Sequence, residues 1–486
     1  MKSCGPAAGR REENRKTGIW VGKENPMDND NTIEEMYTEI TPKLIELSLM
    51  CERTDRIDPG LYEKYDVKPG LRDLNGKGVV AGLTEVSRVS AKKTVDGKEV
   101  PCEGHLYYRG RDVRDLVKGF SEEGRYGYEE AAHLLLFGDL PDRQELEAFR
   151  GILARYQQMF PQNFVREIIM TAPSNDMMNV LARSSLTLYS YDDAADDISL
   201  PNVLRQCLQL IAMMPMIAIY GYQTYQHYYR GNSLVIRQPE PGLSFSENIL
   251  HMLRKDGTFT ALEARILDIC LVLHMEHGGG NNSTFTDRVV TSSGTDTYSV
   301  FAAALGSLKG PRHGGANIKV RRMMEDIKSH VRIWEDKEEV AAYLEKILDR
   351  EAFDHSGLIY GIGHAVYSIS DPRAEILEKF AGMLSEEKGL SQEMNLYHTV
   401  ESLAPSIIAK RSHMYKGVSA NVDFFSGFVY EMLGLPLELY TPLFAIARSV
   451  GWSAHRMEEL ARRGKIIRPA YIPVHDNIPY VPMDRR

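Results

Sequence analysis

Two histidines, His274 and His277, stand three residues apart in the segment LHMEHGGGNNSTF, residues 273–285. They lie near the expected end of a helix that runs into glycines, and three interpretations are open. The pair could simply cap or pack the helix end. It could bind a metal, although H-M-E-H is not the H-E-x-x-H spacing of zinc enzymes and no third ligand is evident nearby. It could also bind an anion, because a helix dipole favours a cationic histidine at its C-terminus, and Asn281 and Ser283 add donors suited to a carboxylate.

Two further histidines lie in glycine-rich segments. In GPRHGGAN, residues 310–317, Pro311 and two glycines predict a turn around His313 and a close approach of the backbone to a ligand. The segment GLIYGIGHAVY, residues 357–367, lacks the last glycine of the dinucleotide-binding G-x-G-x-x-G pattern and the lysine of a phosphate-binding loop. Neither nucleotide motif is therefore expected, and His364 taken alone is an ordinary loop histidine.

A candidate general base is Asp423 in NVDFFSG, residues 421–427. It stands between apolar Val422 and Phe424, where burial would raise its pKa towards the value that a general base needs. A single aspartate at such a place is more often a turn or cap residue. The motif alone leaves both interpretations open.

Three arginines provide local positive charge: Arg373 in DPRA, Arg448 in FAIARSVGW and Arg468 in KIIRP. Each alone would ordinarily be solvated or paired with an acid. The chain has a net charge of -9, which repels anions, so a site for a carboxylate substrate needs clustered arginines. The same charge argues against nucleic-acid binding.

Helices are expected to position these groups. Apolar residues recur with helical spacing after the cap candidate Asp336, at positions 340, 343, 344, 347 and 348, and Thr260 with Glu263 predicts a capping box before a helix that ends near His274. The clearest strand signal is a hairpin around Asp96-Gly97. Because strands and helices do not alternate, the predicted fold class is all-α with a minor N-terminal β-hairpin.

Composition narrows the setting. The five cysteines form no C-x-x-C pair, which favours a reducing cytoplasmic location over a disulfide framework. The longest apolar stretch, residues 210–220, is short and contains Pro215, so no membrane span is expected. Residues 1–26 are interpreted as a disordered leader or a non-native start, with Met27 as an alternative first residue.

Taken in order, the motifs from about residue 60 to the C-terminus resemble the citrate synthase family. H-x-x-H followed by glycines and Asn, G-P-x-H-G-x-A-N, G-x-G-H-x-V, D-P-R, N-V-D-x-x-S-G, A-R-x-x-G-W and I-x-R-P all occur in the family's order and spacing. The resemblance implies that Asp423 removes a proton from the methyl group of acetyl-CoA while neutral His313 donates a hydrogen bond to the enol oxygen. It implies that His364 polarises the ketone of oxaloacetate.

The same resemblance implies how the substrates are bound. Arg468 would come from the second subunit of a homodimer, and neither a metal nor a cofactor is expected, since acetyl-CoA is a substrate. The implied ligands of oxaloacetate are His277, Asn281, Arg373, Arg448 and Arg468. The implied lining of the CoA adenine is Leu358, Ile359, Gly361 and Ala365.

The implied architecture is a large helical domain, residues 27–313 and 429–486, and a small CoA-binding domain, residues 314–428, that closes over the substrates. Met275-Glu276 and Ile318 depart from the usual family pattern beside matched residues. They question the substrate preference, so a 2-methylcitrate synthase acting on propionyl-CoA stays open as the alternative. A non-catalytic CoA-binding protein is disfavoured because Asp423, His313 and His364 are all present.

Overall fold

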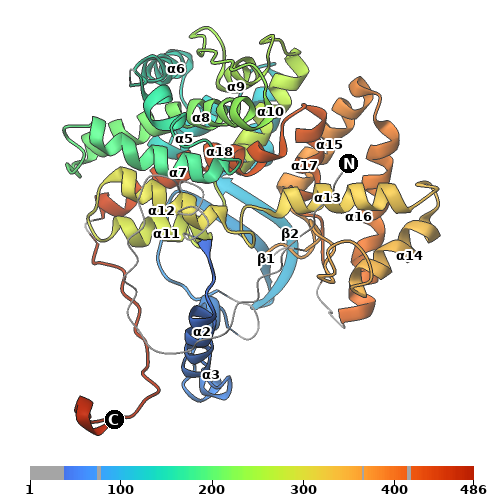
Figure 1. Ribbon diagram of the computed structural model, residues 1–486. Coiled ribbons are helices and arrows are strands. Elements are labelled where there is room, and N and C mark those ends of the chain that lie inside the picture. Colours follow the sequence, from blue (N-terminus) through green and yellow to red (C-terminus); the bar gives the residue numbers. More distant parts are fainter. Residues whose placement is uncertain (1–37, 74–77, 162, 364–365, 413–416, 463) are drawn as a thin grey trace, which may run out of the picture. The chain divides into compact units, whose positions relative to one another are not determined.

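The computed structural model describes residues 38–73, 78–161, 163–363, 366–412, 417–462 and 464–486. It divides into two compact units, Met1–Val80 and Ala81–Arg486. The leader predicted at residues 1–26 lies outside the described residues. Figure 1 shows the chain coloured from its N-terminus to its C-terminus.

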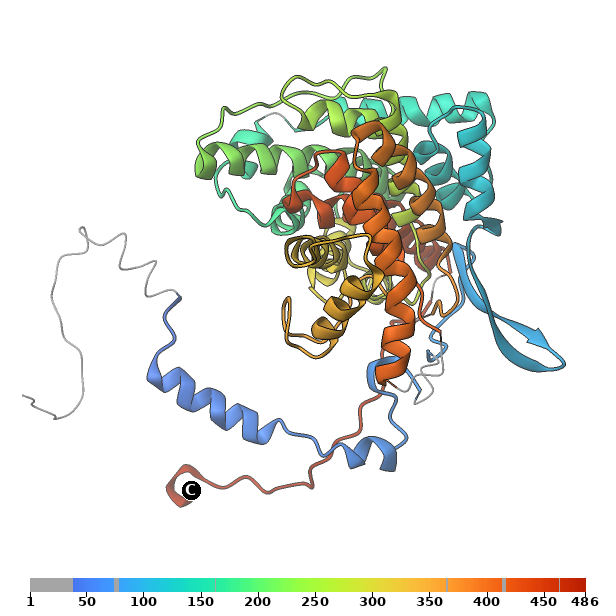
Figure 2. The ribbon, with the colours of Figure 1, turned by 90° about the vertical axis from the view of Figure 1, so that its right-hand side faces the viewer.

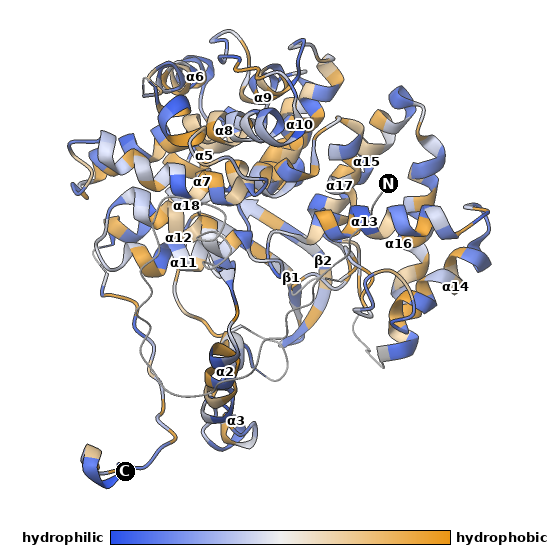
Figure 3. Cartoon of the chain, in the orientation of Figure 1, coloured by the Kyte–Doolittle hydropathy of each residue, from blue (hydrophilic) through white to orange (hydrophobic). Residues whose placement is uncertain are grey.

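The first unit contains helix α2 (Pro42–Thr54), the short helix α3 (Gly60–Lys64) and the 3-10 turn η1 (Pro69–Leu71). Thr41 caps α2 by accepting a hydrogen bond from the Leu44 amide at 3.3 Å, and Pro42 occupies a first-turn position where no amide donor is needed. No residue in the described part of this unit is buried. Both apolar and polar residues occur along α2 (Figure 3), and both kinds are exposed.

The second unit contains the predicted hairpin. Strands β1 (Ser87–Val95) and β2 (Lys98–Tyr108) pair antiparallel, and β3 (Arg111–Asp112) adds a short third strand in the order β1-β2-β3. Asp96 and Gly97 both have positive φ, 50° and 77°, as the two central residues of a type I′ turn require. The hairpin extends away from the helices of this unit (Figure 2), and the sequence prediction is confirmed.

Two long helices lie at the centre of the second unit, α8 (Leu200–Arg230) and α18 (Tyr440–Ala461), and they pack against each other. Helix α8 continues through Pro215, so the helix that contains residues 210–220 is much longer than that apolar stretch. By length and composition α8 could cross a membrane, but 83% of its most apolar window is buried inside the protein. Burial on all sides of Pro215 compensates for the backbone hydrogen bond that proline removes.

Other helices surround this pair. Helix α10 starts with the predicted capping box of Thr260 and Glu263 and ends at His274. The bounds of the helices before residue 310 are α4 (Val113–Glu122), α5 (Tyr128–Phe137), α6 (Arg143–Gln158), α7 (Met177–Thr187), α9 (Phe245–Leu253), α10 (Ala261–His274), α11 (Asn282–Thr291) and α12 (Thr297–Lys309). Short 3-10 or π turns are η2 (Val165–Ile169), η3 (Leu188–Tyr191), η4 (Leu437–Leu439) and η5 (Met483–Arg485).

The chain between α12 and α18 forms a group of helices that pack mainly on one another (Figure 1). They are α13 (Ala316–His330), α14 (Lys337–Leu348), α15 (Pro372–Lys388), α16 (Ser391–Ser412) and α17 (Val422–Met432). Asp336 caps α14 as predicted, accepting hydrogen bonds from the amides of Glu338 and Glu339. This group matches the segment expected to form the small domain, but boundaries at residues 314 and 428 stay a prediction.

Candidate active site

Asp423 occupies the second position of α17, where the Asn421 side chain accepts a hydrogen bond from its amide at 3.0 Å. The side chain is half-buried. Burial raises the pKa of Asp423 to about 6, with the charge of Asp371 adding to the rise and those of Arg373 and Arg448 opposing it. A carboxylate with this pKa is ionised at neutral pH and more basic than an ordinary aspartate, as a general base should be.

The glycine-rich segment before His364 is tied to the segment before Asp423. The amide of Gly363 donates to Ser419 O at 2.8 Å, the amide of Asn421 donates to Gly361 O at 2.9 Å, and the Asn421 side chain donates to Gly363 O at 2.8 Å. Residues far apart in the chain therefore meet at one bridge. His364 and Ala365 themselves lie outside the described residues.

Glycine is required at position 361 by both backbone and space. Gly361 has φ 80°, and an added Cβ would lie 2.7 Å from Val320 Cγ2 and 2.8 Å from Phe424 Cδ2. Of the other residues expected to line the adenine, Leu358 is exposed, whereas Ile359 belongs to the hydrophobic core. The side chain of Ile359 is thus not available to a ligand.

His313 lies in the turn that its proline and glycines predicted. Its amide donates to Gly310 O at 2.8 Å, and a Cβ on Gly314 would lie 2.4 Å from Leu308 O. Burial lowers the pKa of His313 to about 4, and the charge of Arg448 adds to the effect. The ring is therefore neutral at pH 7. His313 Nε2 lies 3.2 Å from Ser283 Oγ and 3.4 Å from the Ser283 amide, and because an amide can only donate, the proton of the neutral ring is assigned to Nδ1.

Arg448 is a fully buried cation with unused donors. Its Nε donates to His274 O at 2.8 Å, and its guanidinium stacks 4.6 Å from the centre of the Phe444 ring. Burial lowers the pKa of Arg448 to about 10, which leaves it charged. Neither terminal nitrogen has a hydrogen-bond partner among the described residues. Such a group is costly in a folded chain unless an anion pairs with it.

Arg373 is also buried but already neutralised. Its Nε and one terminal nitrogen donate to the two carboxylate oxygens of Asp371 at 3.0 and 2.7 Å. Burial lowers the pKa of Arg373 and Asp371 raises it, with a net rise. Asp371 also caps α15 by accepting from the Arg373 amide. The pair thus orients Arg373, and among the described residues no side chain accepts a hydrogen bond from its second terminal nitrogen.

The histidine pair separates into two environments. His274 is buried, its Nδ1 lies 2.7 Å from Cys270 O, and burial lowers its pKa to about 3. The expected cationic form at the helix end is therefore wrong for His274, because desolvation outweighs the helix dipole. His277 is half-buried, with its ring edge-on to Tyr367 at 5.6 Å. In the described part of the chain, neither belongs to a cluster of three metal-binding side chains.

Asn281 and Arg468 complete the expected substrate ligands. Asn281 precedes α11 and its side-chain oxygen accepts from Ser283 Oγ at 3.0 Å, so it lies beside the residue that contacts His313. Arg468 is exposed in the C-terminal segment, where the neighbouring Ile467 amide donates to Ser292 Oγ at 2.9 Å. A single chain therefore does not bring Arg468 together with the buried Arg373 and Arg448.

Sequence reasoning missed the partners of Glu276. This buried carboxylate accepts from Ser87 Oγ at 2.9 Å and lies 3.1 Å from His455 Nε2. Burial alone would raise the pKa of Glu276, but His455 and Arg448 outweigh it and lower the value to about 2. The available signal was the acidic residue between the two histidines. Its partners on other elements carry no signal in the sequence.

These groups define a candidate enzyme site, in which the buried cation of Arg448 acts on a carboxyl of raised pKa and on a neutral histidine. Comparison with known proteins gives the family. The family described as "Citrate synthase, C-terminal domain" matches residues 73–470. The chain belongs to the citrate synthase family, whose members are condensing transferases.

Individual relatives agree with this assignment. The citrate synthase of Synechocystis sp. is 36% identical over 84% of this chain and 92% of its own length. A 2-methylcitrate synthase of Corynebacterium glutamicum is 30% identical over 83% of this chain and 94% of its own length. The citrate synthase of Thermoplasma acidophilum, solved as a ternary complex with carboxymethyl coenzyme A and oxaloacetate, is 25% identical, covers 86% of this chain and 99% of its own, and superposes with a TM-score of 0.69.

Proposed function

We propose that this chain condenses acetyl-CoA with oxaloacetate and water to give citrate and CoA through an enol intermediate. One observation carries the proposal: Arg448 is a buried cation whose two terminal nitrogens have no hydrogen-bond partner among the described residues. Its charge acts on both Asp423, whose pKa is about 6, and the neutral ring of His313. That combination suits a substrate with carboxylates and a step that moves a proton from carbon.

Asp423 takes a proton from the methyl group of acetyl-CoA. As negative charge develops on the thioester oxygen, Nδ1–H of His313 donates a hydrogen bond to it and stabilises the enolate form of the intermediate. A positioned base and a positioned donor each contribute about 2 to 4 kcal/mol to such a step. A neutral histidine suits this role because its N–H can donate a hydrogen bond to the oxygen and the ring carries no positive charge.

The enol carbon then attacks the ketone carbon of oxaloacetate, and a carbon–carbon bond forms. His364 polarises the ketone and stabilises the developing alkoxide, a role assigned from its motif. Water cleaves the thioester of the resulting citryl-CoA, releasing citrate and CoA. These steps need only the two substrates, water and the protein's own side chains.

The carboxylates of oxaloacetate bind to His277, Asn281, Arg373 and Arg448, with Arg468 supplied by the second subunit of a homodimer. The exposed position of Arg468 supports this arrangement, because a side chain outside its own chain's cluster remains able to reach a neighbour's. Residues 314–428 act as a small domain that binds CoA and closes over the substrates, with Leu358, Ile359, Gly361 and Ala365 beside the adenine. The reaction takes place in the cytoplasm.

The acyl group is the open part of the substrate. Relatives include both citrate and 2-methylcitrate synthases, and the citrate synthase of Synechocystis sp. has a higher identity to this chain than the 2-methylcitrate synthase of Corynebacterium glutamicum. The test is release of CoA thiol with oxaloacetate, comparing kcat/KM for acetyl-CoA and propionyl-CoA. A higher value for acetyl-CoA supports citrate synthesis. A higher value for propionyl-CoA replaces it with 2-methylcitrate synthesis, and no thiol release with either overturns the proposal.

A further inference from the structure

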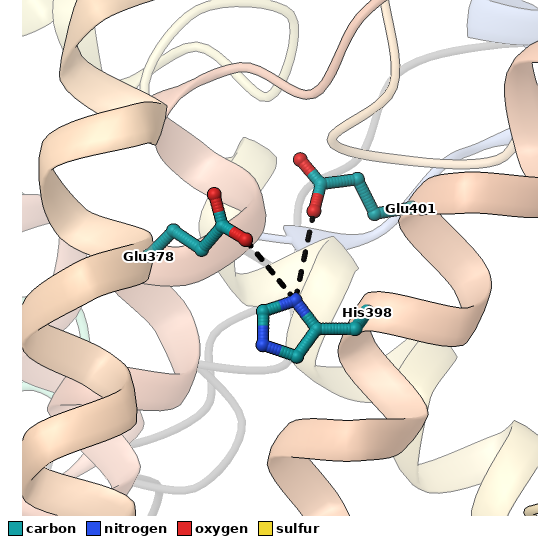
Figure 4. Close-up of side chains that lie close together, drawn as sticks. All are labelled: Glu378, His398 and Glu401. Carbon is teal, nitrogen blue, oxygen red and sulfur yellow. Dashed lines mark ion pairs between the residues drawn. The ribbon is translucent and has the colours of Figure 1, made fainter.

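Three metal-binding side chains lie together outside the set of candidate active-site residues. Glu378 comes from α15, whereas His398 and Glu401 come from α16, and all three point toward one another between the two helices (Figure 4). His398 Nδ1 lies 3.1 Å from Glu378 Oε1 and 4.0 Å from Glu401 Oε2, and the three ligand atoms all lie within 4.8 Å of one another. Two ligands share a helix face because they are three residues apart.

The charges in this cluster are not balanced. In the described part of the chain, no lysine or arginine forms an ion pair with Glu378 or Glu401, and the only partner of either carboxylate is His398. Two carboxylates that face one imidazole nitrogen, without another cation, form a concentrated negative site that a divalent cation would neutralise.

The donor set selects the kind of ion. Magnesium and calcium prefer oxygen ligands only, whereas one imidazole nitrogen and two carboxylate oxygens suit zinc and its neighbours among the transition metals. Ligand atoms about 2.0 to 2.2 Å from a tetrahedral zinc ion lie about 3.3 Å apart. The distances of 3.1 and 4.0 Å to His398 Nδ1 are close to this value, so small side-chain rotations bring the atoms to bonding positions. The side chains remain 28% to 42% exposed, which gives the ion an entry path and a place for water as fourth ligand.

We propose that Glu378, His398 and Glu401 bind a divalent transition metal ion, with Zn²⁺ as the fitting probe, and that this ion links α15 to α16. Both helices lead towards the active site. Helix α15 begins at Pro372 and Arg373, and Tyr397, next to His398, stacks on Phe428 with ring centres 4.5 Å apart. The bound ion therefore stabilises the framework around the site without contacting a substrate.

The test is a titration of the full-length protein, purified with chelator and then freed of it, with Zn²⁺ followed by calorimetry. We expect one site per chain and a higher melting temperature when Zn²⁺ is bound. Glu378→Gln, Glu401→Gln and His398→Ala should each weaken Zn²⁺ binding at this site at least about tenfold. The matched control is Glu386→Gln, an exposed glutamate on the same helix α15, which should bind Zn²⁺ as the original chain does.

Substitution of Co²⁺ for Zn²⁺ reports the ligands directly, because its visible absorption depends on coordination. The spectrum of the original chain should be that of four-coordinate cobalt with nitrogen and oxygen ligands, and it should be lost in His398→Ala. Circular dichroism checks that each variant is folded, and the glutamine variants, which remove a charge from a crowded pair, should be at least as stable as the original. Equal Zn²⁺ affinity in the original chain and all three variants, or no binding by the original chain, overturns the proposal.

Discussion

Glu276 and His455 lie side by side in the core, with 3.1 Å between Glu276 Oε1 and His455 Nε2 and neither side chain accessible to solvent. The pair links the end of α10 to α18. On its other side, the His455 ring accepts a hydrogen bond from Arg288 Nε at 3.1 Å. A Cβ at Gly451 would lie 2.4 Å from Glu276 Oε2, so α18 carries a glycine where the carboxylate approaches. The pair thus fixes the backbone that bears His277.

This pair predicts a dependence of stability on pH. The pKa of Glu276 falls from 4.5 to about 2 on folding, so its stabilising contribution is present above pH 4.5 and is lost as pH falls towards 2. Glu276→Gln should lower the free energy of unfolding at pH 7 by on the order of 3 kcal/mol, and by much less at pH 3. Urea unfolding at both pH values measures this. An equal loss at the two pH values would assign the effect to packing, and exposed Glu386→Gln is the control.

Asp423 predicts the shape of the pH–rate profile. Since the base must be ionised, kcat/KM for the acyl-CoA should rise with pH through about 6 and then level off, whereas an ordinary aspartate would place the rise near 3.8. His313, with a pKa of about 4, should add no change above pH 5. Asp423→Asn should lower turnover by about 10² to 10⁴. A variant that keeps a tenth of normal turnover would remove Asp423 from the mechanism.

If Asp423→Asn is as stable as the original chain, its lower turnover cannot be attributed to unfolding. The pKa of Asp423 is higher in the folded chain than the usual 3.8, so stability present below pH 3.8 is lost as pH rises through 6. Removing the charge should therefore leave the free energy of unfolding at pH 8 equal or higher, by up to about 3 kcal/mol. Denaturant unfolding at pH 8 is the check.

Arg448 predicts a separation of binding from stability. Arg448→Met keeps most of the volume but removes a buried charge whose terminal nitrogens lack partners among the described residues. Oxaloacetate affinity should fall about 100-fold or more, because a charge-assisted pair is lost, while thermal stability without substrate should not fall. Calorimetry and thermal unfolding measure the two effects. Unchanged oxaloacetate affinity in a folded variant would exclude Arg448 from the site.

Arg468 predicts complementation between two inactive variants. Arg468→Ala and Asp423→Ala should each be nearly inactive as homodimers. In a mixed dimer, one site combines both lesions and the other pairs an intact Asp423 with the partner's Arg468. Random mixing makes about half the dimers mixed, so activity should return to roughly a quarter of normal. Co-expression with two different tags isolates the mixed dimers, and no recovery would mean that Arg468 does not act in trans.

Turns and helix caps were predictable from the sequence, whereas the burial of individual side chains was not. The Asp96-Gly97 turn, the capping box at Thr260 and the cap at Asp336 depend on residues within four positions of one another. Pro215 does not end its helix, because packing on all sides stabilises that helix. His274 misled because burial, which no short motif encodes, outweighed the helix dipole.

The same limit applies to the site. The motifs gave candidate groups for the family reaction, but they could not show that Arg373 is already paired or that Glu276 contacts a residue 179 positions later in the chain. Glu378 and His398 belong to different helices, so their proximity depends on how α15 packs on α16. Each of these contacts depends on how the helices and loops pack, which short motifs do not encode.

The bridge between Gly361, Gly363 and Asn421 has a mechanical consequence. Three hydrogen bonds of 2.8 to 2.9 Å attach the glycine-rich loop to the N-terminal end of the Asp423 helix, and Gly361 packs directly on Phe424. Because of these contacts, we expect the loop at residues 361–363 and Asp423 to move together as one rigid body. A motion that changes the distance between this rigid body and Arg448 should leave the distance between the loop and Asp423 nearly constant.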